Sequence, residues 1–461
     1  MNINFELKGG LNEKNILDIY HCACELLEKM GMEATNTEML KYLENIDGFE
    51  IKDSYIKIKR SEIERCVRYQ YENTEQDTIK AYELQILSGY PIYIEDRSEG
   101  ILRSVSTSDA IEQTKLISGL HRSGVTGSTP VVPQDVHPSL RHLKCFMIGA
   151  EYDSGGPDVS IGSPKTAEFL LPMMEAVDKE PILGVFVLNP LKACGDTFDT
   201  LHTYHKKFRK FTAGCMPLMG VTAPIYISGA LIMALASALG TMAIIRAYVP
   251  DAECNVEARC WSVDMKSLNM AYGMPQMVLG DLCYELFRKF FHWGVNGCKA
   301  FHSQALKSDA QANGQRGAYA MAMALSGQRV FQYGGLLGTD MVFSPIQLMY
   351  DLELLKYVKS VTDGFDFSKE SLDIDQIINV GCSGDYLYED STLDHYRDLT
   401  FRSELWTGGS VTNEILMSKT DQMLCCAKEK IDRIIRQHSY HAPEDRIKEL
   451  EHIYKCASKR L

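Results

Sequence analysis

A set of polar and aromatic side chains that could bind a small molecule occurs in residues 253–261, an apolar and β-prone segment. Its small apolar residues alternate with a second set, Asn255, Glu257, Arg259 and Trp261. Successive side chains of a strand point to opposite faces, so the second set would lie together on one face. Buried charges are costly unless they are paired or used. We therefore favour a binding function over the structural alternative, a buried salt bridge between Glu257 and Arg259.

Two further β-prone segments end in residues suited to a binding site. One ends in a run that contains Lys299, His302 and Gln304, and the other places Tyr333 before two glycines. In barrels of parallel strands, ligands bind where the strands end in loops. The two glycines would let a ligand approach the backbone closely, or they would form a tight turn. They do not belong to a phosphate loop, because no Lys-Ser or Lys-Thr pair follows them.

Motifs of hydrolytic and metal chemistry are missing from the sequence. It contains no G-x-S-x-G, H-E-x-x-H or D-x-D-x-D-G run, and its 14 cysteines include no C-x-x-C pair. Two H-x-x-H pairs, at 202–205 and 438–441, lie in charged helical surroundings without a third ligand fixed nearby. We expect neither a metal site nor a catalytic nucleophile in this chain.

The elements that would position these residues begin near residue 124. Short apolar runs that end in Gly, Pro or Ser start at 125, 158, 182, 211, 253, 297 and 329. Helical stretches separate many of them, at 166–177, 225–247, 277–293 and 310–326. Repeated β-then-α units require a parallel sheet with crossover helices. At least seven of them predict a (β/α)8 TIM barrel of the α/β class, with a doubly wound sheet as the alternative.

The regions on either side of this repeat have different patterns. Residues 12–70 show helical spacing with a short β segment at 55–58, and residues 91–106 alternate around a Ser-Glu-Gly turn, which predicts a hairpin. Residues 107–109, Thr-Ser-Asp, would cap the next helix. We predict an N-terminal helical and hairpin extension at 1–120, the barrel at 121–400, and C-terminal helices at 401–461, on the barrel exterior or at a subunit contact.

Residues 223–245 are apolar enough to span a bilayer. The segment is solitary, lacks flanking basic anchors and is rich in small residues that allow close packing. We predict a helix buried in the core of the domain.

Charge and cysteine content exclude several classes of function. The chain carries 61 acidic against 48 basic side chains, a net charge of -13, which disfavours nucleic acids and anionic membranes as partners. Many unpaired cysteines and the lack of an export signal at the N-terminus indicate a reducing compartment. We expect a cytoplasmic protein that forms a homo-oligomer.

A series of short motifs resembles the MttB-like (trimethylamine methyltransferase) superfamily. The run Pro-Leu-Met-Gly-Val-Thr-Ala-Pro at 217–224 leads into a Gly/Ala-rich helix, as the P-L-x-G-x-T-A-P run does in that family. Similar pieces follow in the same order: Asp264-Met265, Asp309-Ala310-Gln311-Ala312, Gly334-Gly335-Leu336-Leu337, Asp351, and the tail at 375–396. The similarity spans residues 100–440, and the ordered series is specific although no single piece is.

The resemblance implies a TIM-barrel enzyme that transfers a methyl group from a methylated amine to the cobalt of a separate corrinoid protein. Pyrrolysine, present in the archaeal trimethylamine members, is absent here. Members without it resemble enzymes that demethylate quaternary amines such as glycine betaine, proline betaine, carnitine or γ-butyrobetaine. The chain departs from the family at Gln304, Gln315 and Gln276, where relatives have acidic residues, and at Phe343, where a small residue is common. The lost acids agree with a zwitterionic substrate.

This chemistry needs little from the protein beyond orientation and electrostatics, because the nucleophile is an external Co(I) and the leaving amine is neutral. An aromatic box would attract the cation by about 0.5–2 kcal/mol per ring contact. Candidate rings are Trp261, Tyr333, Phe343 and Tyr226. A substrate carboxylate would be bound by Arg259 or Lys299, or by His302 and Gln304. The corrinoid would come from the partner protein rather than from a site on this chain.

Two other functions remain open at this stage. Lys299 at a strand end could form the Schiff base of a TIM-barrel lyase. Alternatively, the chain could be a betaine-binding or corrinoid-docking homologue without turnover.

Overall fold

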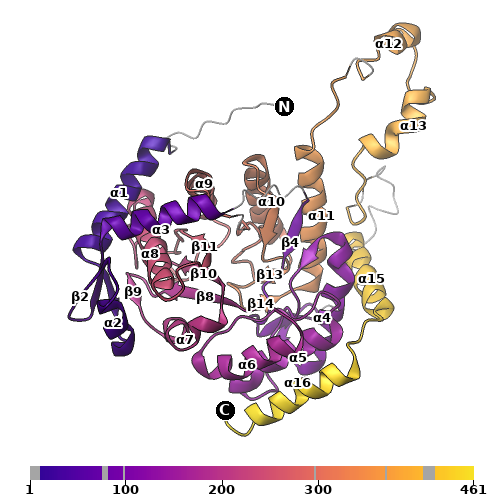
Figure 1. Ribbon diagram of the computed structural model, residues 1–461. Helices are drawn as coiled ribbons and strands as arrows, with labels where there is room; N and C mark the ends of the chain where they lie inside the picture. Colours follow the sequence, from indigo (N-terminus) through magenta and orange to yellow (C-terminus); the bar gives the residue numbers. More distant parts are fainter. Residues whose placement is uncertain are drawn as a thin grey trace.

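The computed structural model describes residues 11–74, 81–96, 99–294, 297–368, 371–406, 408 and 421–461. It is a mixed α/β structure in which helices surround short strands (Figure 1). The N-terminal region contains α1 (Glu13–Lys29), α2 (Thr37–Glu44) and α3 (Arg60–Asn73). Between them β1 (Met32–Ala34), β2 (Phe49–Lys52) and β3 (Tyr55–Ile58) form a small sheet, to which β9 (Lys192–Ala193) adds a parallel strand. The predicted helical pattern and the strand at 55–58 are confirmed.

Two three-stranded parallel sheets form the centre of the molecule. In the first, β10 (Lys210–Cys215) lies between β8 (Ile182–Val187) and β11 (Glu253–Glu257). In the second, β4 (Glu83–Gln85) lies between β12 (Val330–Gln332) and β7 (Val125–Thr126), and a bridge from Cys298 to Phe331 extends it. Hydrogen bonds among the described strands do not join the two sheets into a closed ring.

The predicted crossover helices occur close to their expected positions. They are α6 (Pro164–Ala176), α8 (Ile227–Tyr248), α9 (Pro275–Phe290) and α10 (Ala310–Leu325), and α5 (Arg141–Tyr152) and α7 (Asp196–Tyr204) add to this layer. The strand predicted at 158–164 is wrong, because the backbone there forms no ladder. This segment is a weak strand former. It contains one glycine and one proline, and its buried apolar residues are only Val159 and Ile161.

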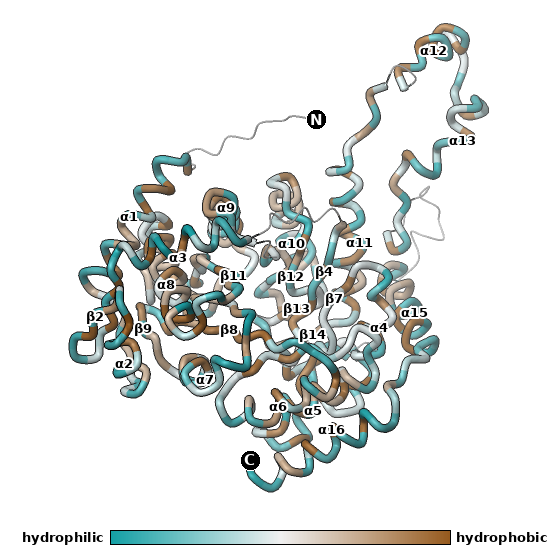
Figure 2. The backbone as a smooth tube through the Cα atoms, in the orientation of Figure 1, coloured by the Kyte–Doolittle hydropathy of each residue, from teal (hydrophilic) through white to brown (hydrophobic). Residues whose placement is uncertain are grey.

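Helix α8 packs mainly against α1, α3, β8 and β10, and also contacts β11 and α9. It is the one described helix that is long and apolar enough to cross a membrane, but 72% of its apolar window is buried within the protein. Its brown colour in Figure 2 marks the apolar side chains that it contributes to the larger of the two main core clusters. The helix lies in the core, as predicted.

The predicted hairpin consists of β5 (Tyr93–Glu95) and β6 (Leu102–Ser104). Ser98, in its predicted turn, lies outside the described residues. The hairpin pairs with β14 (Val342–Phe343), which pairs in turn with β13 (Leu336–Leu337). The next helix, α4 (Thr107–Leu120), begins where predicted, and Ser106 and Asp109 form its capping box.

The C-terminal part begins with α11 (Pro345–Thr362) and continues through α12 (Ile374–Val380) and α13 (Asp390–Leu399). Figure 1 shows α12 and α13 far from the rest of the molecule. The chain then returns to α15 (Gln422–Gln437), which packs on α4 and α11, and α16 (Glu444–Ala457), which packs on α5 and α6. The division at residues 120 and 400 stays a prediction.

Candidate active site

The ends of strands from both parallel sheets meet around one buried lysine. Lys299 follows the bridge at Cys298, and its side chain is almost fully buried. Its Nζ donates hydrogen bonds to Gln332 Oε1 (2.7 Å) and Tyr333 Oη (2.9 Å) and lies 3.6 Å from Glu257 Oε2. Glu257 ends β11, and Gln332 ends β12. The sequence segments that contain predicted site residues are therefore brought together by the strands.

The charge state of Lys299 is set by these neighbours. Burial by itself would lower the pKa of the Lys299 ammonium, but attraction to Glu257 and Tyr333 outweighs burial and raises it. Lys299 is consequently protonated at neutral pH. A Schiff-base lysine must react as the free amine, so this environment argues against the lyase alternative.

His302 lies in a stack of aromatic rings. Its ring is 4.0 Å from the ring of Tyr272 and 3.9 Å from that of Tyr333, and the planes are inclined by 12° and 7°. Trp261 contacts the edge of the stack, 5.6 Å from Tyr272 and 5.7 Å from His302, centroid to centroid. Burial lowers the pKa of the His302 imidazole, so the ring between the two tyrosines is neutral.

Asp340 holds one end of this stack. One of its carboxylate oxygens, Oδ2, accepts a hydrogen bond from the Tyr272 hydroxyl (2.8 Å), and Oδ1 lies 2.9 Å from His302 Nε2. Burial alone would raise the pKa of Asp340, but hydrogen bonding with His302 and the Tyr272 hydroxyl and attraction to Lys299 outweigh burial and lower it. Asp340 is thus a buried anion next to the aromatic stack.

The backbone at Tyr333 adopts a conformation that is unusual for an aromatic residue, with φ at +76°. The N–H groups of Tyr333 and Gly334 both donate to the Gln85 carbonyl, over 2.6 and 3.0 Å. Such a conformation costs of the order of 1–3 kcal/mol and persists where the surroundings fix it. The strained backbone directs the Tyr333 side chain toward Lys299 and His302.

The glycines after Tyr333 form a tight turn. Gly335 has φ at +72°, and its N–H donates to Oδ2 of the buried Asp351 (2.7 Å). The same carboxylate accepts a hydrogen bond from Arg316 (2.5 Å), which also donates to the Leu336 carbonyl. Two of the motif positions in the sequence, Gly335 and Asp351, therefore act by fixing the loop that carries Tyr333.

A cavity of about 140 Å³ lies beside Tyr333. Polar groups of its wall come from the ends of β4 and β12 and from the segment at 158–160: Gln85, Ser88, Asp158, Ser160, Gln332 and Tyr333. A cavity of roughly 150 Å³ can hold benzene, so this one has room for a small organic head group.

The predicted site residues fall into two groups. Trp261, His302 and Tyr333 lie together, and Glu257 is joined to them through Lys299. Gln304 is not among the residues that line the cavity, and its side-chain amide donates to the Met270 carbonyl (2.8 Å). Phe343 lies in β14 against Gly335, and Tyr226 precedes α8 with 78% of its surface exposed. Of the four predicted rings, Tyr333 is the one that lines the cavity.

Arg259 does not line the cavity and is paired elsewhere. Its Nη2 donates to the Gly297 carbonyl (2.8 Å), its Nε lies 3.3 Å from Asp281 Oδ1, and its guanidinium lies over the Tyr284 ring. The ion pair between Glu257 and Arg259, which was the structural alternative in the sequence, is therefore replaced by the pairs Glu257–Lys299 and Arg259–Asp281.

Sequence reasoning did not identify Tyr272, Asp340, Gln85 or Asp158 as site residues. Tyr272 and Asp340 lie in loops without periodicity, and Gln85 and Asp158 come from short segments that carry no recognisable motif. Their proximity depends on long-range strand pairing. Among the described residues, no group of three or more His, Cys, Asp and Glu side chains is placed to hold a metal ion.

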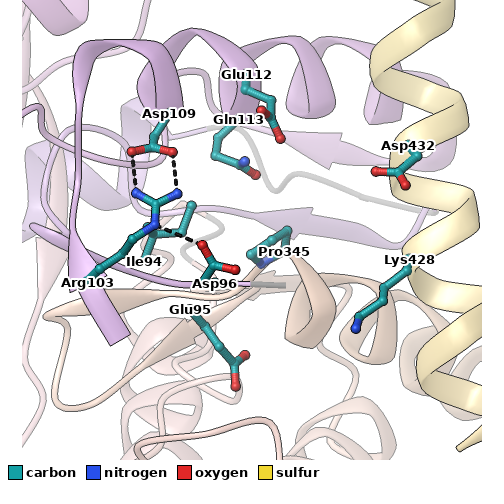
Figure 3. A pocket seen from close by; sticks show the side chains of 10 residues that line it. All are labelled: Ile94, Glu95, Asp96, Arg103, Asp109, Glu112, Gln113, Pro345, Lys428 and Asp432. Atoms are coloured by element: carbon teal, nitrogen blue, oxygen red, sulfur yellow. Dashed lines mark hydrogen bonds and ion pairs between the residues drawn. The ribbon is translucent and has the colours of Figure 1, made fainter. Parts of the chain in front are cut away.

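Another pocket, of about 380 Å³, lies between the hairpin, α4 and α15 (Figure 3). Arg103 donates two hydrogen bonds to Asp109 (2.7 and 2.8 Å) and one to Asp96 (2.9 Å) across it. None of the described residues that line it is aromatic. Its ion pairs join the hairpin to α4, and we assign it a structural role.

An aromatic stack, a buried charge pair and a small cavity at the ends of parallel strands are features expected of a small-molecule site in an α/β protein. The sequence matches the trimethylamine methyltransferase (MTTB) family model over residues 5–444, and the chain belongs to this family.

Relatives from bacteria and archaea are similar over different lengths. The chain is 20% identical to a trimethylamine methyltransferase MttB of Desulfitobacterium hafniense, over 84% of this chain and 82% of that protein. It is 21% identical to a glycine betaine methyltransferase of another strain of that species, over 84% of each chain. A trimethylamine methyltransferase MttB of Methanosarcina barkeri is 27% identical over 37% of this chain and 34% of its own.

The motifs that carry the resemblance have clear structural roles. In the run at 217–224, Gly220 has φ at +81° and the Thr222 hydroxyl accepts a hydrogen bond from the Leu218 N–H (2.8 Å), which forms a turn before α8. Asp309 caps α10 by accepting a hydrogen bond from the Ala312 N–H (3.0 Å).

Proposed function

We propose that this protein transfers a methyl group from a quaternary amine to Co(I) of a separate corrinoid protein. Membership of the family and the names of its relatives support the reaction type. The structural observation behind the proposal is the cavity beside Tyr333, whose ring is held by strained backbone at the strand ends. A cavity of about 140 Å³ is far too small for a corrin ring, so it fits the amine. The corrinoid is then a second substrate that the partner carries.

The reaction breaks the bond between nitrogen and the methyl carbon, and the electron pair remains on nitrogen as a neutral tertiary amine. The methyl carbon bonds to cobalt through the electron pair of Co(I). No proton is transferred, so the protein needs no general acid. Neutral His302 and protonated Lys299 agree with a site that orients its substrate.

The electrostatics of the site suit a cation whose charge disappears during the reaction. Binding a cation too tightly opposes the transition state, because the charge on nitrogen is lost there. Glu257 is balanced by Lys299, and Asp158 in the cavity wall accepts a hydrogen bond from Ser88 (2.9 Å), while the Tyr333 ring provides moderate attraction of about 0.5–2 kcal/mol. We infer that the ammonium head binds against Tyr333.

Within this proposal, the substrate is of the betaine type and carries a carboxylate. Arg259 is committed to Asp281, and His302 is enclosed by two rings, so neither receives the carboxylate. Lys299 remains, 2.7 Å from Gln332 Oε1 behind the cavity wall, together with the hydroxyl of Ser160, whereas the Ser88 hydroxyl donates to Asp158 Oδ2 (2.9 Å). In a zwitterion, Lys299 and Ser160 would bind the carboxylate, and Asp158 in the cavity wall would attract the ammonium head.

We also propose that the two parallel sheets are arcs of one (β/α)8 barrel. Parallel bridges at Leu218–Trp261 and Cys298–Phe331 extend the strand pairing beyond the assigned strands, and helices follow the strands in chain order. An experimental structure that showed an open sheet with helices on both faces would refute this.

The decisive experiment mixes the protein with cob(I)alamin and a panel of quaternary amines and follows the absorption spectrum of methylcobalamin. We expect product with betaines and none with the solvent control. If betaines bind but no methylcobalamin forms, either with free cob(I)alamin or with the corrinoid protein as acceptor, the result would instead favour a betaine-binding homologue. In calorimetry, equal binding of glycine betaine and tetramethylammonium would contradict the carboxylate assignment.

A further inference from the structure

The side chains of β8 alternate between the two faces of the first parallel sheet. Leu183, Val185 and Val187 are buried, whereas Ile182 and Phe186 are 54% and 40% exposed. Successive side chains of a strand point to opposite faces of the sheet. Phe186 therefore lies on the face that is turned away from the core cluster containing α8.

This face is the one that carries Glu257 of the buried charge pair. Phe186 is opposite Gly214 in the pairing of β8 with β10, and Gly214 is opposite Glu257 in the pairing of β10 with β11. Residues opposite one another on paired parallel strands have their side chains on the same face. Glu257 lies 3.6 Å from Lys299, which donates to the Tyr333 hydroxyl. Phe186 is thus on the same side of the sheet as the candidate active site.

The Phe186 ring lies across two glycines that make room for it. A Cβ at Gly214 would overlap one edge of the ring, and a Cβ at Gly184 would lie 2.6 Å from the other edge. Both glycines are in strands, and neither has a positive φ, so the backbone conformation does not require glycine there. Glycine weakens the interior of a strand and is found where another group approaches closely. We therefore attribute Gly184 and Gly214 to the ring and call them its seat.

In the proposed barrel, Phe186 and Tyr333 belong to opposite walls. In one direction, β10, β11 and the segment at Cys298 lie between β8 and β12. In the other direction, β4, β7 and the segment that carries Asp158 and Ser160 lie between them. Three strand positions therefore separate β8 from β12 on each side.

The side of the ring that faces away from the seat is accessible. Barrel interiors are normally filled by layers of side chains, yet 40% of Phe186 is exposed. The segment that precedes β8 in this wall lines the cavity beside Tyr333 through Asp158 and Ser160. An apolar ring that is fixed on the sheet and left uncovered next to a cavity is suited to contact a ligand.

We propose that Phe186 is a second aromatic wall of the ammonium site, across from Tyr333. The inference rests on the proposed function and on the proposed barrel. Rings on two sides of the cation increase the attraction without adding a further carboxylate, so no additional fixed charge opposes the loss of charge during transfer. Phenylalanine also has no hydroxyl that would need a hydrogen-bond partner in the seat.

The first test measures the attraction between the ring and the cation. Fluorine atoms on a phenylalanine ring make its face less negative and change its shape little. Phenylalanines with one, two and three fluorine atoms are incorporated at position 186 of the full-length protein, and calorimetry measures the binding of glycine betaine. We expect the affinity to fall with each fluorine, by about 2- to 30-fold over the series. The same series at Phe367, which is 77% exposed and lies beyond α11, should leave the affinity unchanged.

The second test displaces the ring from its seat. Gly214→Ala should reduce the affinity for glycine betaine, because the new Cβ takes the place of a ring edge. In a Phe186→Ala background the same substitution should have much less effect, since no ring remains to be displaced. Gly314→Ala, whose Cβ would meet nothing within 4 Å, is the control and should not change the affinity in either background.

The outcomes separate this inference from the proposed function. If the protein forms methylcobalamin but its affinity for glycine betaine does not depend on fluorination at position 186, the inference alone is overturned. If the affinity falls with fluorination but no methylcobalamin forms, the ring contact is supported and methyl transfer is refuted. A wild type that binds no quaternary amine would overturn both. Equal effects of Gly214→Ala with and without the Phe186 ring would overturn the role of the seat.

Discussion

At the residue scale, Tyr333 connects the parts of the site. Its hydroxyl accepts a hydrogen bond from Lys299, one face of its ring stacks on His302, and it lines the cavity. Its backbone is strained, and the carbonyl of Gln85 in the neighbouring strand holds it in place. A residue kept in an unfavourable conformation at a cavity wall is a strong candidate for substrate contact.

Replacing Tyr333 separates the role of the ring from that of the hydroxyl. Tyr333→Ala should weaken betaine binding by about 0.5–2 kcal/mol, or up to about 30-fold, because the ring face is lost. Tyr333→Phe should retain most of the affinity. Calorimetry with glycine betaine measures both, and Tyr55→Ala, an exposed tyrosine on β3, is the control. Equal affinity of Tyr333→Ala and wild type would rule out the contact.

Asp351 shows how a motif residue can serve the site without contacting ligand. Asp351→Asn would leave the fully buried Arg316 without its counter-ion and weaken the bond to the Gly335 N–H. We expect a loss of about 3–5 kcal/mol in the free energy of unfolding in urea. Glu38→Gln, which breaks an exposed pair with Lys41, should change it little. Similar effects of both substitutions would contradict this role.

Sequence patterns identified some of these residues and missed others for a physical reason. Trp261, His302 and Tyr333 could be found because each lies at the end of a recognisable apolar run. Tyr272 and Asp340 could not, because only folding brings their loops to the stack. Tyr226 shows that a recognisable position in the sequence is not sufficient. It is aromatic and lies next to a family motif, but its side chain is exposed just before α8.

At the element scale, helices were predictable and strand pairing was less so. Helices α6, α8, α9 and α10 begin and end within a few residues of their predicted bounds, because caps and periodicity are local signals. Strands are as short as two residues, and their hydrogen bonds depend on distant segments. The segment at 158–164 has strand-like composition but forms no ladder.

Two glycines within helices should respond oppositely to alanine. A Cβ at Gly280 of α9 would lie 3.0 Å from the carbonyl oxygen of Cys260, next to Trp261, whereas one at Gly314 of α10 would meet nothing within 4 Å. We expect Gly280→Ala to destabilise the protein by about 1–3 kcal/mol through overpacking. Gly314→Ala should stabilise it by about 0.5–1 kcal/mol through helix propensity. Thermal unfolding of both variants tests whether α9 approaches the Cys260 backbone this closely at Gly280. Stability changes of the same sign in the two variants would refute it.

At the scale of the whole molecule, the buried stack makes stability depend on pH. The pKa of His302 is lowered in the folded state, so the unfolded chain takes up a proton first as the pH falls below about 6.5. The contribution of His302 is therefore complete above that pH and decreases below it. His302→Phe keeps a ring between the tyrosines but cannot titrate. Between pH 8 and 5, the free energy of unfolding in urea should decrease less for this variant than for the wild type. An equal decrease in both proteins would contradict the assignment.

Charge is unevenly distributed over the molecule. Most of the net charge of -13 belongs to residues 363–406, and the remaining chain is nearly balanced. The total charge of the sequence disfavoured nucleic acid, but a total does not show where the charge lies. The folded structure adds that α12 and α13, which carry part of this charge, lie far from the rest of the molecule (Figure 1).

The burial of α8 also bears on protein synthesis. Most of its contacts are with α1, α3, β8 and β10, which precede it in the chain and have left the ribosome before α8 emerges, whereas β11 and α9 follow it. The most apolar segment can then be covered as it appears, instead of waiting exposed to chaperones or to the membrane-insertion machinery. A circular permutant that moved α1 and α3 to the carboxyl end would remove that cover during translation.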